Sequence, residues 1–472
     1  MPIIVMKFGG SCLLDKTAFR NILEIINIYK DVKKIIVVSA FKGITDLLQN
    51  TALGLGDEIK TDKNISLIEK KHMDVIEQIF EEDSEYYIKA KDWIDDKLSE
   101  LDDAFADIKE FGLEPYYSDY VLSFGEVLST YILNQYLLSR NIESIYIPAN
   151  KVIITNDEFN NAYPLYELTN SRIKKLLIPF IENPNKDIVM CLTGFIARNK
   201  IGYITTLGRG GSDYTATILA HSLYNSSNDK NIKVILWKDV DGLLAINPKY
   251  APESSLIKNL DYEEAKHIAK FGAKILHPKC LEAIEKYKIP LEIRNFEKPL
   301  DNNYTKISSL SDKEQIKGIS VIEYAIIITV ISASLVDVPG VLAKIFKTMS
   351  KNKISVSFVA QSSSEIGTSF IVNAEDSEIA IKALNDSEFF TDFFEVKWEE
   401  VAVINIIGLK ILETKTKAEI FNALDKKNVK VKAISQGLDE LNLSLVVERE
   451  RLIDAINVIH DDLCEDFGPK LH

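Results

Sequence analysis

The first 306 residues alternate short apolar runs with longer amphipathic ones. The short runs are rich in valine and isoleucine and end at Gly, Pro, Asn or a charged residue, which is typical of buried β-strands. We expect strands at residues 3–8, 33–41, 144–150, 187–195, 233–240 and 289–296. Between them, apolar positions at helical spacing predict helices, for example at 18–30 and 213–224. Strands that alternate with helices indicate an α/β domain with a mostly parallel sheet.

A long acidic stretch interrupts this alternation at residues 57–114. Its apolar residues recur at spacings of three and four, which predicts amphipathic helices. Charged residues fill the remaining positions, so we expect a helical subdomain with a solvated acidic face rather than a surface that binds a specific charge. The polar residues 307–317 then indicate a linker.

An internal repeat occupies the rest of the chain. The segment that begins at Phe346 aligns without gaps with the segment that begins at Phe421, an offset of 75 residues. Each copy predicts the order strand, helix, strand, hairpin turn, strand and final helix. Two copies are too few for a solenoid, so we expect two small α/β modules that pack together, with strands near Ile319 and Val401 that can be exchanged between them. The expected modules span residues 318–398 and 399–472.

Composition narrows the class of protein. The 472 residues carry 70 acidic and 56 basic side chains, a net charge of −14, which argues against broad nucleic-acid binding and against docking on anionic lipid. The longest uncharged apolar run, residues 324–336, has 13 residues and is too short to span a membrane. The amino terminus lacks the basic region of a signal peptide, and the four cysteines are scattered. We therefore expect a cytoplasmic protein without disulfides or a structural zinc site.

Polar, glycine-containing turns follow two of the predicted strands at their carboxyl ends, where ligands bind in open α/β sheets. Lys7 lies at the end of the first strand and precedes Gly9 and Gly10. Glycines let backbone N–H groups approach phosphate oxygens, and a lysine can neutralise a transferring phosphoryl group. An ordinary strand-to-turn junction would explain the same residues. The second strand leads to Ser39 and Thr45, which are either ligand hydroxyls or caps of the next helix.

Two further motifs contain charged residues next to glycines. In SFGE we expect Glu126 in the first turn of a helix, where it either caps the helix or accepts a substrate ammonium. The run TTLGRGGSDYT has three glycines around Arg209, before a helix that opens at Ser212 or Asp213. Such a helix start binds anions, and Arg209 can hold a carboxylate or phosphate through two parallel hydrogen bonds. This run is the strongest candidate anion site in the sequence.

Lysines recur in the later loops. WKDVDG places Lys238 and Asp239 at a strand end, and Lys249 and Lys274 lie in the segments that follow. His277 precedes a proline, which indicates a structural helix start rather than a catalyst. In a chain with a charge of −14, cations gathered in glycine-bearing loops predict one pocket for ATP together with an acidic substrate.

These motifs, in this order, resemble the aspartate kinase (aspartokinase) family of the amino-acid kinase superfamily. The resemblance is carried by KFGGSCL, VVSAFKGITDLL, SFGE, LTGF, TLGRGGSDYTA, KDVDG and FGAKILHP, and the repeat resembles the family's tandem ACT regulatory domains. It implies a carbamate kinase-like three-layer α/β/α sandwich over residues 1–306, followed by two ferredoxin-like α+β domains. It also implies phosphoryl transfer from ATP to the side-chain carboxylate of L-aspartate, with Mg²⁺ carried by ATP and no metal ligands from the protein.

The resemblance implies roles for individual residues. The catalytic residues would be Lys7, which stabilises the transferring phosphoryl group, and Asp213. Glu126 would bind the substrate ammonium and Arg209 a carboxylate. The residues implied for ATP are Lys7, Gly9, Gly10, Ser39, Asp239, Lys249 and Lys274. The residues implied for aspartate are Thr45, Glu126, Phe195, Arg209 and Ser212.

The chain departs from the resembled family in one block. The family usually has TDVxGIYTxDPR where this chain has KDVDGLLAINPK. Lys238 stands where Thr is common, Leu244 where an aromatic residue often covers the adenine, and Lys249 where Arg is usual. Lysine keeps the charge of arginine but loses its two-pronged hydrogen bonding. We therefore expect ATP affinity or base selectivity to differ from those of the family.

The ACT resemblance implies feedback regulation by an amino acid. Gln361 and Gln436 occupy equivalent positions in the two repeats, and an amide can bond a hydroxyl or a carboxylate without a cation. Lysine-responsive members often have aspartate where Ser357 stands, so we expect threonine as the effector, with lysine next. The other interpretation is that both glutamines are ordinary hairpin residues. We expect a homodimer or larger assembly through the ACT domains and, because the chain stops at His472, no fused homoserine dehydrogenase.

An aspartate kinase would catalyse the first step of lysine, threonine and methionine biosynthesis. Two other functions remain possible. One is a kinase for another acidic amino acid, such as glutamate or N-acetylglutamate. The other is an amino-acid sensor with an inactive kinase domain. A nicotinamide-dependent dehydrogenase is disfavoured, because the first strand and turn lack GxGxxG.

Overall fold

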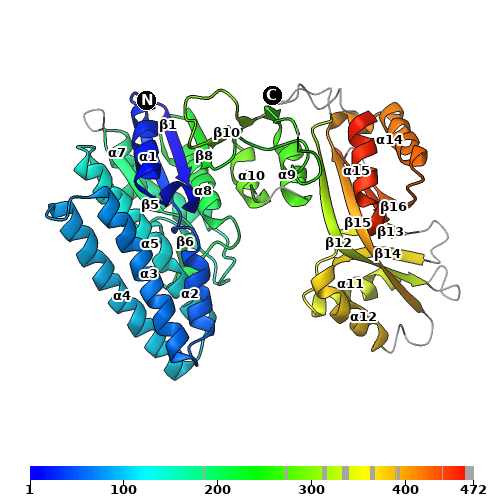
Figure 1. Ribbon diagram of the computed structural model, residues 1–472, viewed down its shortest axis with the longest axis horizontal. Coiled ribbons are helices and arrows are strands. Elements are labelled where there is room, and N and C mark those ends of the chain that lie inside the picture. Colours follow the sequence, from blue (N-terminus) through cyan, green and yellow to red (C-terminus); the bar gives the residue numbers. More distant parts are fainter. Residues whose placement is uncertain are drawn as a thin grey trace. The chain divides into compact units, whose positions relative to one another are not determined.

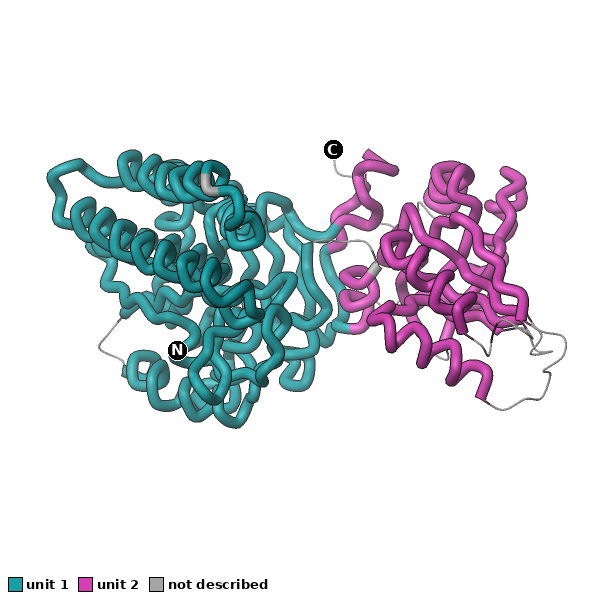
Figure 2. Tube along the Cα trace, turned by 90° about the horizontal axis from the view of Figure 1, so that it is seen from below, with its two compact units in different colours: residues 1–243, 258–262, 275–311 teal, residues 244–257, 263–274, 312–472 magenta. Residues whose placement is uncertain are grey.

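The computed structural model forms two compact units (Figure 2). The first comprises residues 1–243, 258–262 and 275–311, and the second comprises residues 244–257, 263–274 and 312–472. No helix in the described ranges is long and apolar enough to cross a membrane. The residues that the structure describes are 1–183, 187–252, 254–271, 275–310, 316–331, 340–361, 367–387, 390, 394–437 and 440–462.

An eight-stranded sheet forms the centre of the first unit (Figure 1). Its order is β3-β5-β2-β1-β8-β10-β11-β9, and the strands from β3 to β10 all run parallel. The sequence predicts these six strands, but it does not predict the short β9 and β11. The strands are β1 (Ile3–Phe8), β2 (Lys33–Val38), β3 (Ser144–Ile147), β5 (Val189–Thr193), β8 (Ile232–Lys238), β9 (Asn259–Leu260), β10 (Leu291–Asn295) and β11 (Thr305–Ile307).

Helices and a small second sheet complete this unit. The small sheet has the order β4-β6-β7 and consists of β4 (Ile154–Thr155), β6 (Ile196–Asn199) and β7 (Ile204–Thr206). The helices are α1 (Lys16–Ile28), α2 (Ile44–Leu53), α3 (Glu58–Ile79), α4 (Glu85–Phe111), α5 (Pro115–Ser139), α6 (Tyr166–Leu176), α7 (Ile178–Ile181), α8 (Gly211–Ser226) and α10 (Pro278–Glu285).

The two faces of the large sheet have different partners. Side chains alternate between the faces along each strand. Met6 and Phe8 of β1 share a core with apolar residues of α1, α3, α4 and α5. Lys7 therefore points to the opposite face, where α8 contacts both β1 and β8. This alternation brings a lysine of the central strand to the helix that begins after the glycine-rich loop.

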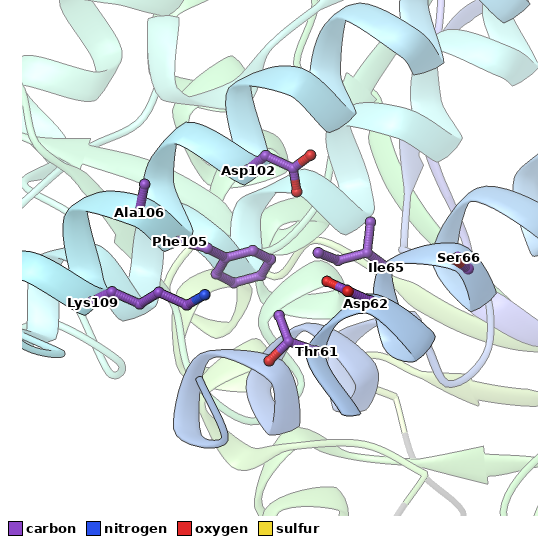
Figure 3. A pocket seen from close by; sticks show the side chains of 8 residues that line it. All are labelled: Thr61, Asp62, Ile65, Ser66, Asp102, Phe105, Ala106 and Lys109. Atoms are coloured by element: carbon purple, nitrogen blue, oxygen red, sulfur yellow. The ribbon is translucent and has the colours of Figure 1, made fainter. Parts of the chain in front are cut away.

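The acidic stretch folds into two long antiparallel helices, α3 and α4, as the sequence predicts (Figure 1). Asp57 and Ser84 cap them by accepting hydrogen bonds from backbone N–H groups in their first turns. A pocket of about 430 Å³ opens between the helices (Figure 3). Asp62 and Asp102 contribute carboxylates to it from the two helices, and burial together with nearby carboxylates raises the pKa of Asp102.

The second unit is built on a six-stranded antiparallel sheet of order β13-β14-β12-β15-β17-β16. β13 and β14 of the first repeat correspond to β16 and β17 of the second. The strands are β12 (Gly318–Ile331), β13 (Phe358–Gln361), β14 (Gly367–Asn373), β15 (Glu395–Ile407), β16 (Val431–Ser435) and β17 (Asn442–Glu448). The helices are α9 (Tyr262–Phe271), α11 (Val341–Lys351), α12 (Ser377–Asn385), α14 (Thr414–Lys426) and α15 (Leu452–Asp462).

β12 and β15 each run through both modules. Residues 325–331 of β12 pair with β14 of the first module, and residues 401–407 of β15 pair with β17 of the second. Residues 318–322 of β12 pair with residues 403–407 of β15, and the register shifts between Ile322 and Ala325. Residues 318–322, at the start of the first module, therefore pair with a strand of the second module.

Candidate active site

Three charged side chains meet at the carboxyl ends of β1 and β8. Nζ of Lys7 lies 2.7 Å from Oδ1 of Asp213, and Nζ of Lys238 lies 2.6 Å from Oδ2 of the same carboxylate. The side chains of Lys7 and Asp213 are only 7% and 5% exposed. Burial by itself would raise the pKa of Asp213, but Lys238 and Lys7 outweigh it and lower this pKa to about 2. Asp213 is therefore ionised at neutral pH and holds both ammonium groups.

The two glycine-bearing loops after β1 and β2 lie in contact next to this network. A Cβ added to Gly10 would lie 2.6 Å from the carbonyl oxygen of Ala40, so only glycine fits at this approach. Gly9 lies beside Lys7, because a Cβ added to it would come within 3.5 Å of the lysine Nζ. The backbone N–H of Ser39 donates to the carbonyl of Phe8 and continues the strand pairing into the loop.

Ser39 and Thr45 do not cap the helix that follows them. Helix α2 has Gly43 as its N-cap, with a φ of 82° and no side-chain cap bond. The capping interpretation is thus wrong for both residues. Ser39, in the loop after β2, and Thr45, in the first turn of α2, are both half-buried and remain ligand candidates.

The sequence suggested that Glu126 lies in the first turn of a helix, but it lies in the middle of α5. The helix begins at Pro115. Proline is favoured at the first helical position, because the backbone N–H that it lacks would have no partner within the helix there. The side chain of Glu126 is buried, and Oγ of Ser212 donates to its Oε1 at 3.4 Å. Burial raises the pKa of Glu126 to about 8, against the opposing effect of the Ala40 backbone N–H. The cap interpretation is therefore wrong, and Glu126 is a buried carboxyl group beside the start of α8.

Phe195 links the loop after β5 to the start of α8. Its φ is 66°, which is unfavourable for a residue with a side chain and is held by the surrounding contacts. Its backbone N–H donates to Oγ1 of Thr215 at 2.9 Å, and its carbonyl accepts from the N–H of Leu207 at 3.0 Å. A Cβ on Gly211 would collide with the ring of Phe195. Glycine at this position therefore allows Phe195 to pack directly against the start of α8.

Arg209 lies in the loop between β7 and α8, with an exposed side chain. Gly208 and Gly210 on either side have φ values of 76° and 68°, which side-chain-bearing residues rarely adopt. Helix α8 has Gly210 as its N-cap and begins at Gly211, slightly earlier than the sequence suggested. Arg209 is therefore held three residues before Ser212 and four before Asp213, at the same helix start.

Asp119 anchors this loop, and the sequence analysis did not identify it. Its carboxylate accepts hydrogen bonds from the N–H and Oγ1 of Thr206, both at 2.8 Å, and from the N–H of Asn160. The residue is fully buried on α5. It precedes Glu126 by seven residues, which places both acids on one face of the helix. That spacing, in a helix that contains no other charged residue, is the signal that could have revealed it.

The remaining residues predicted to bind nucleotide lie in different places. Asp239 follows Lys238 at the end of β8 and is exposed. Lys249 belongs to the second unit, where its Nζ lies 2.6 Å from Oε1 of Glu323. Lys274 lies outside the described residues. His277 caps α10 by accepting a hydrogen bond from the backbone N–H two residues later, which confirms its predicted structural role.

The two glutamines predicted to bind an effector lie at equivalent places in the two modules. Gln361 is the last residue of β13, and Gln436 follows the last residue of β16. β13 and β16 contact each other, although they are the two ends of the strand order. Nε2 of Gln436 donates to the carbonyl of Glu440 at 3.3 Å, as a hairpin residue would.

The donor set suits a metal that arrives with a phosphate group. In the part of the chain that the structure describes, no three His, Cys, Asp or Glu side chains gather as metal ligands would. Both carboxylate oxygens of Asp213 face ammonium groups. A Mg²⁺ ion at this site would therefore take most of its oxygens from a nucleotide and from water.

Comparison with known families agrees with this geometry. The model of the amino acid kinase family matches residues 2–295. The chain belongs to the amino acid kinase family. An ACT domain model matches residues 328–387 and 404–463, so tandem ACT domains follow the kinase domain. The expected fold, a mostly parallel α/β kinase domain followed by an ACT region, is confirmed.

Among curated relatives of this amino acid kinase, the bifunctional aspartokinase/homoserine dehydrogenase of Buchnera aphidicola is 29% identical over 97% of this chain and 56% of that protein. Aspartokinase 1 of Arabidopsis thaliana is 28% identical over 98% of this chain and 80% of that protein. The chain spans 50–56% of the length of the bifunctional relatives.

Solved structures show the same fold. E. coli aspartokinase III in complex with aspartate and ADP superposes with a TM-score of 0.81, 25% identity and coverage of 98% of this chain and 100% of that chain. The same enzyme in complex with lysine and aspartate superposes with a TM-score of 0.78.

We predict that Asp119→Asn destabilises the kinase domain. An amide would turn an NH₂ group toward the donors of Thr206 and Asn160, and an unmet buried hydrogen bond costs about 1–3 kcal/mol. The free energy of unfolding, measured by chemical denaturation, should fall by this amount. The matched control is Asp157→Asn, an exposed position that should change stability little. Equal stability of the two variants would show that Asp119 does not anchor the loop.

Proposed function

We propose that this amino acid kinase is an ATP-dependent aspartate kinase that forms 4-phospho-L-aspartate. One observation carries the proposal. The buried Lys7–Asp213–Lys238 network lies next to the Ser212–Glu126 pair, because Ser212 and Asp213 are neighbours at the start of α8. A cationic centre for phosphate thus adjoins a carboxyl group that can bind an ammonium. The likeness to aspartokinase III in complex with aspartate and ADP supports the same substrates.

The chemistry requires positioning more than acid–base catalysis. An oxygen of the aspartate side-chain carboxylate forms a bond to the γ-phosphorus of ATP. The bond from this phosphorus to the oxygen that bridges to the β-phosphate breaks, and its electron pair leaves with ADP. Because the carboxylate is already a nucleophile, no base is needed. Lys7 would stabilise the transferring phosphoryl group, and Asp213 would hold Lys7 in place.

The substrate would lie between the start of α8 and the middle of α5. Glu126 would bind its ammonium, and Arg209 would bind its α-carboxylate through two parallel hydrogen bonds. Ser212 and Thr45 would supply hydroxyl groups, and Phe195 would contact the hydrocarbon part. The hydrogen bond between the side chains of Ser212 and Glu126 supports this arrangement, because it places both residues next to the same ligand position.

The nucleotide would extend from the two glycine-bearing loops toward the end of β8. Gly9, Gly10 and Ser39 would line its phosphates, and Mg²⁺ would bind to phosphate oxygens. Asp239, Lys249 and Lys274 are the further nucleotide candidates. For Lys249, this role would require release from Glu323.

We propose that the enzyme acts at the first step of lysine, threonine and methionine biosynthesis, as a homodimer or larger assembly through its ACT domains, with L-threonine as the feedback effector. The equivalent positions of Gln361 and Gln436, at the ends of two contacting strands, support an effector site formed by both modules. An uncharged amide suits the hydroxyl of threonine better than the ammonium of a lysine side chain.

We expect purified protein to release ADP from ATP and Mg²⁺ only when L-aspartate is present. A coupled assay of ADP release, repeated with glutamate and N-acetylglutamate, tests the substrate. Lys7→Ala should lower kcat more than it weakens aspartate binding, because Lys7 acts on the transferring group. Turnover with glutamate instead of aspartate, or no turnover while an amino acid still binds, would contradict the proposal.

Arg209→Ala should raise the KM for aspartate roughly 10- to 150-fold, because a charge-assisted hydrogen bond contributes about 1.5–3 kcal/mol. The KM for ATP should stay close to the wild-type value. Lys200→Ala removes an exposed cation from the hairpin between β6 and β7 and serves as the control. An unchanged aspartate KM in Arg209→Ala would exclude the carboxylate role.

Aspartate affinity should increase with pH between about 6.5 and 8.5. Glu126 is protonated in the empty site at neutral pH, because burial raises its pKa to about 8, and it must ionise to bind an ammonium. Below this pKa, affinity should rise by up to about tenfold per pH unit and should then level off. Glu126→Gln should remove the dependence. A wild-type KM that is independent of pH would argue against this pairing.

L-Threonine should inhibit the kinase and release or absorb heat on titration, whereas L-lysine should do so more weakly. Isothermal titration calorimetry measures both, and Gln361→Ala and Gln436→Ala should each weaken threonine binding, since each removes an amide partner. Glutamine-to-alanine changes that leave binding intact would show that both are ordinary hairpin residues. Silence with threonine together with heat from lysine would reverse the choice of effector.

A further inference from the structure

We propose that Lys238 is a second catalytic cation that contacts the β-phosphate of the nucleotide, on the leaving-group side of the reaction. This inference rests on the proposed aspartate kinase function. In the sequence, Lys238 is one of several lysines in the loops and stands where the resembled family usually has threonine.

The register of the sheet places the two lysines on one face. β1 and β8 are adjacent parallel strands in which Lys7 pairs with Leu236. Lys238 is two residues farther along β8, and positions that differ by two point to the same face. Lys238 therefore lies about 6–7 Å beyond Lys7 toward the carboxyl edge of the sheet. Trp237 between them points to the other face and packs with Phe8.

Asp213 cannot neutralise both lysines. Burial lowers the pKa of Lys7, an effect that Asp213 opposes, whereas Asp213 outweighs burial at Lys238 and raises its pKa. With both lysines protonated, one carboxylate faces two ammonium groups at 2.7 and 2.6 Å, and the three side chains together carry one net positive charge. Cys12 and Cys280 lie close by, but burial raises the pKa of both thiols, that of Cys12 to about 11, so both stay neutral.

The other acids near the network do not neutralise this charge in the empty site. Burial keeps Glu126 protonated at neutral pH. Asp239 is exposed at the end of β8, where water screens its charge. A net positive charge among largely buried side chains is costly unless an anion binds to it. The network therefore favours an anionic ligand, which the phosphates of a nucleotide supply.

The order of the strands assigns the two lysines to different parts of the reaction. The Ala40 loop and Glu126 lie on the β2 side of β1, whereas Lys238 lies on the β8 side. With aspartate bound near Glu126, Lys7 stands between the substrate and Lys238. Negative charge accumulates on the leaving ADP during phosphoryl transfer. In the Lys7–Asp213–Lys238 network, Lys238 is the cation on that side, so it would stabilise the β-phosphate as the bond to the γ-phosphorus breaks.

A purely structural role for Lys238 makes a different prediction. If Lys238 served only as a counterion of Asp213, its loss would leave the Lys7–Asp213 pair electrically neutral and the nucleotide contacts intact. If Lys238 contacts the β-phosphate, its loss weakens the binding of nucleotides that have a β-phosphate and leaves the binding of those without one unchanged. The two cases can be separated by binding experiments that need no turnover.

The test compares Lys238→Met, Lys238→Arg and wild type by isothermal titration with ADP and with AMP, each with Mg²⁺. Lys238→Met should weaken ADP binding at least tenfold and change AMP binding less than threefold, and Lys238→Arg should restore part of the loss. Lys233→Met is the matched control, because Lys233 lies on the same strand, points to the other face and pairs with Glu292. It should bind both nucleotides as wild type does.

The same variants should show a fall in kcat for Lys238→Met that exceeds any change in the aspartate KM. In the Asp213→Asn background, Lys238→Met should still weaken ADP binding, since the phosphate contact does not pass through the carboxylate. Equal loss of ADP and AMP binding, unchanged ADP binding, or a loss that disappears with Asp213→Asn would overturn the proposal. Selective loss of ADP binding in a protein that does not phosphorylate aspartate would uphold Lys238 and refute the aspartate kinase function instead.

Discussion

The bridge from one buried carboxylate to two lysines is the interaction on which the site depends. Asp213 lies in the first turn of α8, where the helix dipole favours a negative charge. Lys7 and Lys238 come from neighbouring parallel strands whose ends meet at one edge of the sheet. The bridge thus joins the sheet to the helix at the place where a ligand would bind. It also preorganises two cations before any ligand arrives, which would lower the reorganisation that the proposed phosphoryl transfer requires.

Close backbone approaches, rather than long side chains, bring the other loops to this bridge. Gly10 allows the loop after β1 to contact the carbonyl of Ala40. A Cβ on Gly194 would lie 2.6 Å from the Cβ of Ser212, so this glycine lets the loop after β5 reach the start of α8. Each approach excludes even one methyl group. The substrate side of the site is therefore fixed by backbone geometry and sets Glu126 beside Ser212.

The sequence predicts most of the fold because its signals are local. The six parallel strands are short runs rich in valine and isoleucine, and the glycines that surround Arg209 mark its loop without any tertiary information. The features that the sequence does not predict depend on residues that are farther apart in the chain. The start of α5 is set by Pro115, eleven residues before Glu126, and a four-residue motif does not contain it. Asp119 accepts hydrogen bonds from Thr206, 87 residues away. No local pattern specifies such a partner.

One strand of the second unit, β12, is shared by both modules and also holds the segment that carries Lys249. The segment that follows the β8 turn attaches to β12 through a backbone bridge between Ile246 and Ile319 and through the Lys249–Glu323 ion pair. Glu323 lies at the register shift where β12 passes from one module to the other. The segment that carries Lys249 is therefore tied to β12 by a backbone contact and a side-chain contact, at the point where the strand passes from one module to the other.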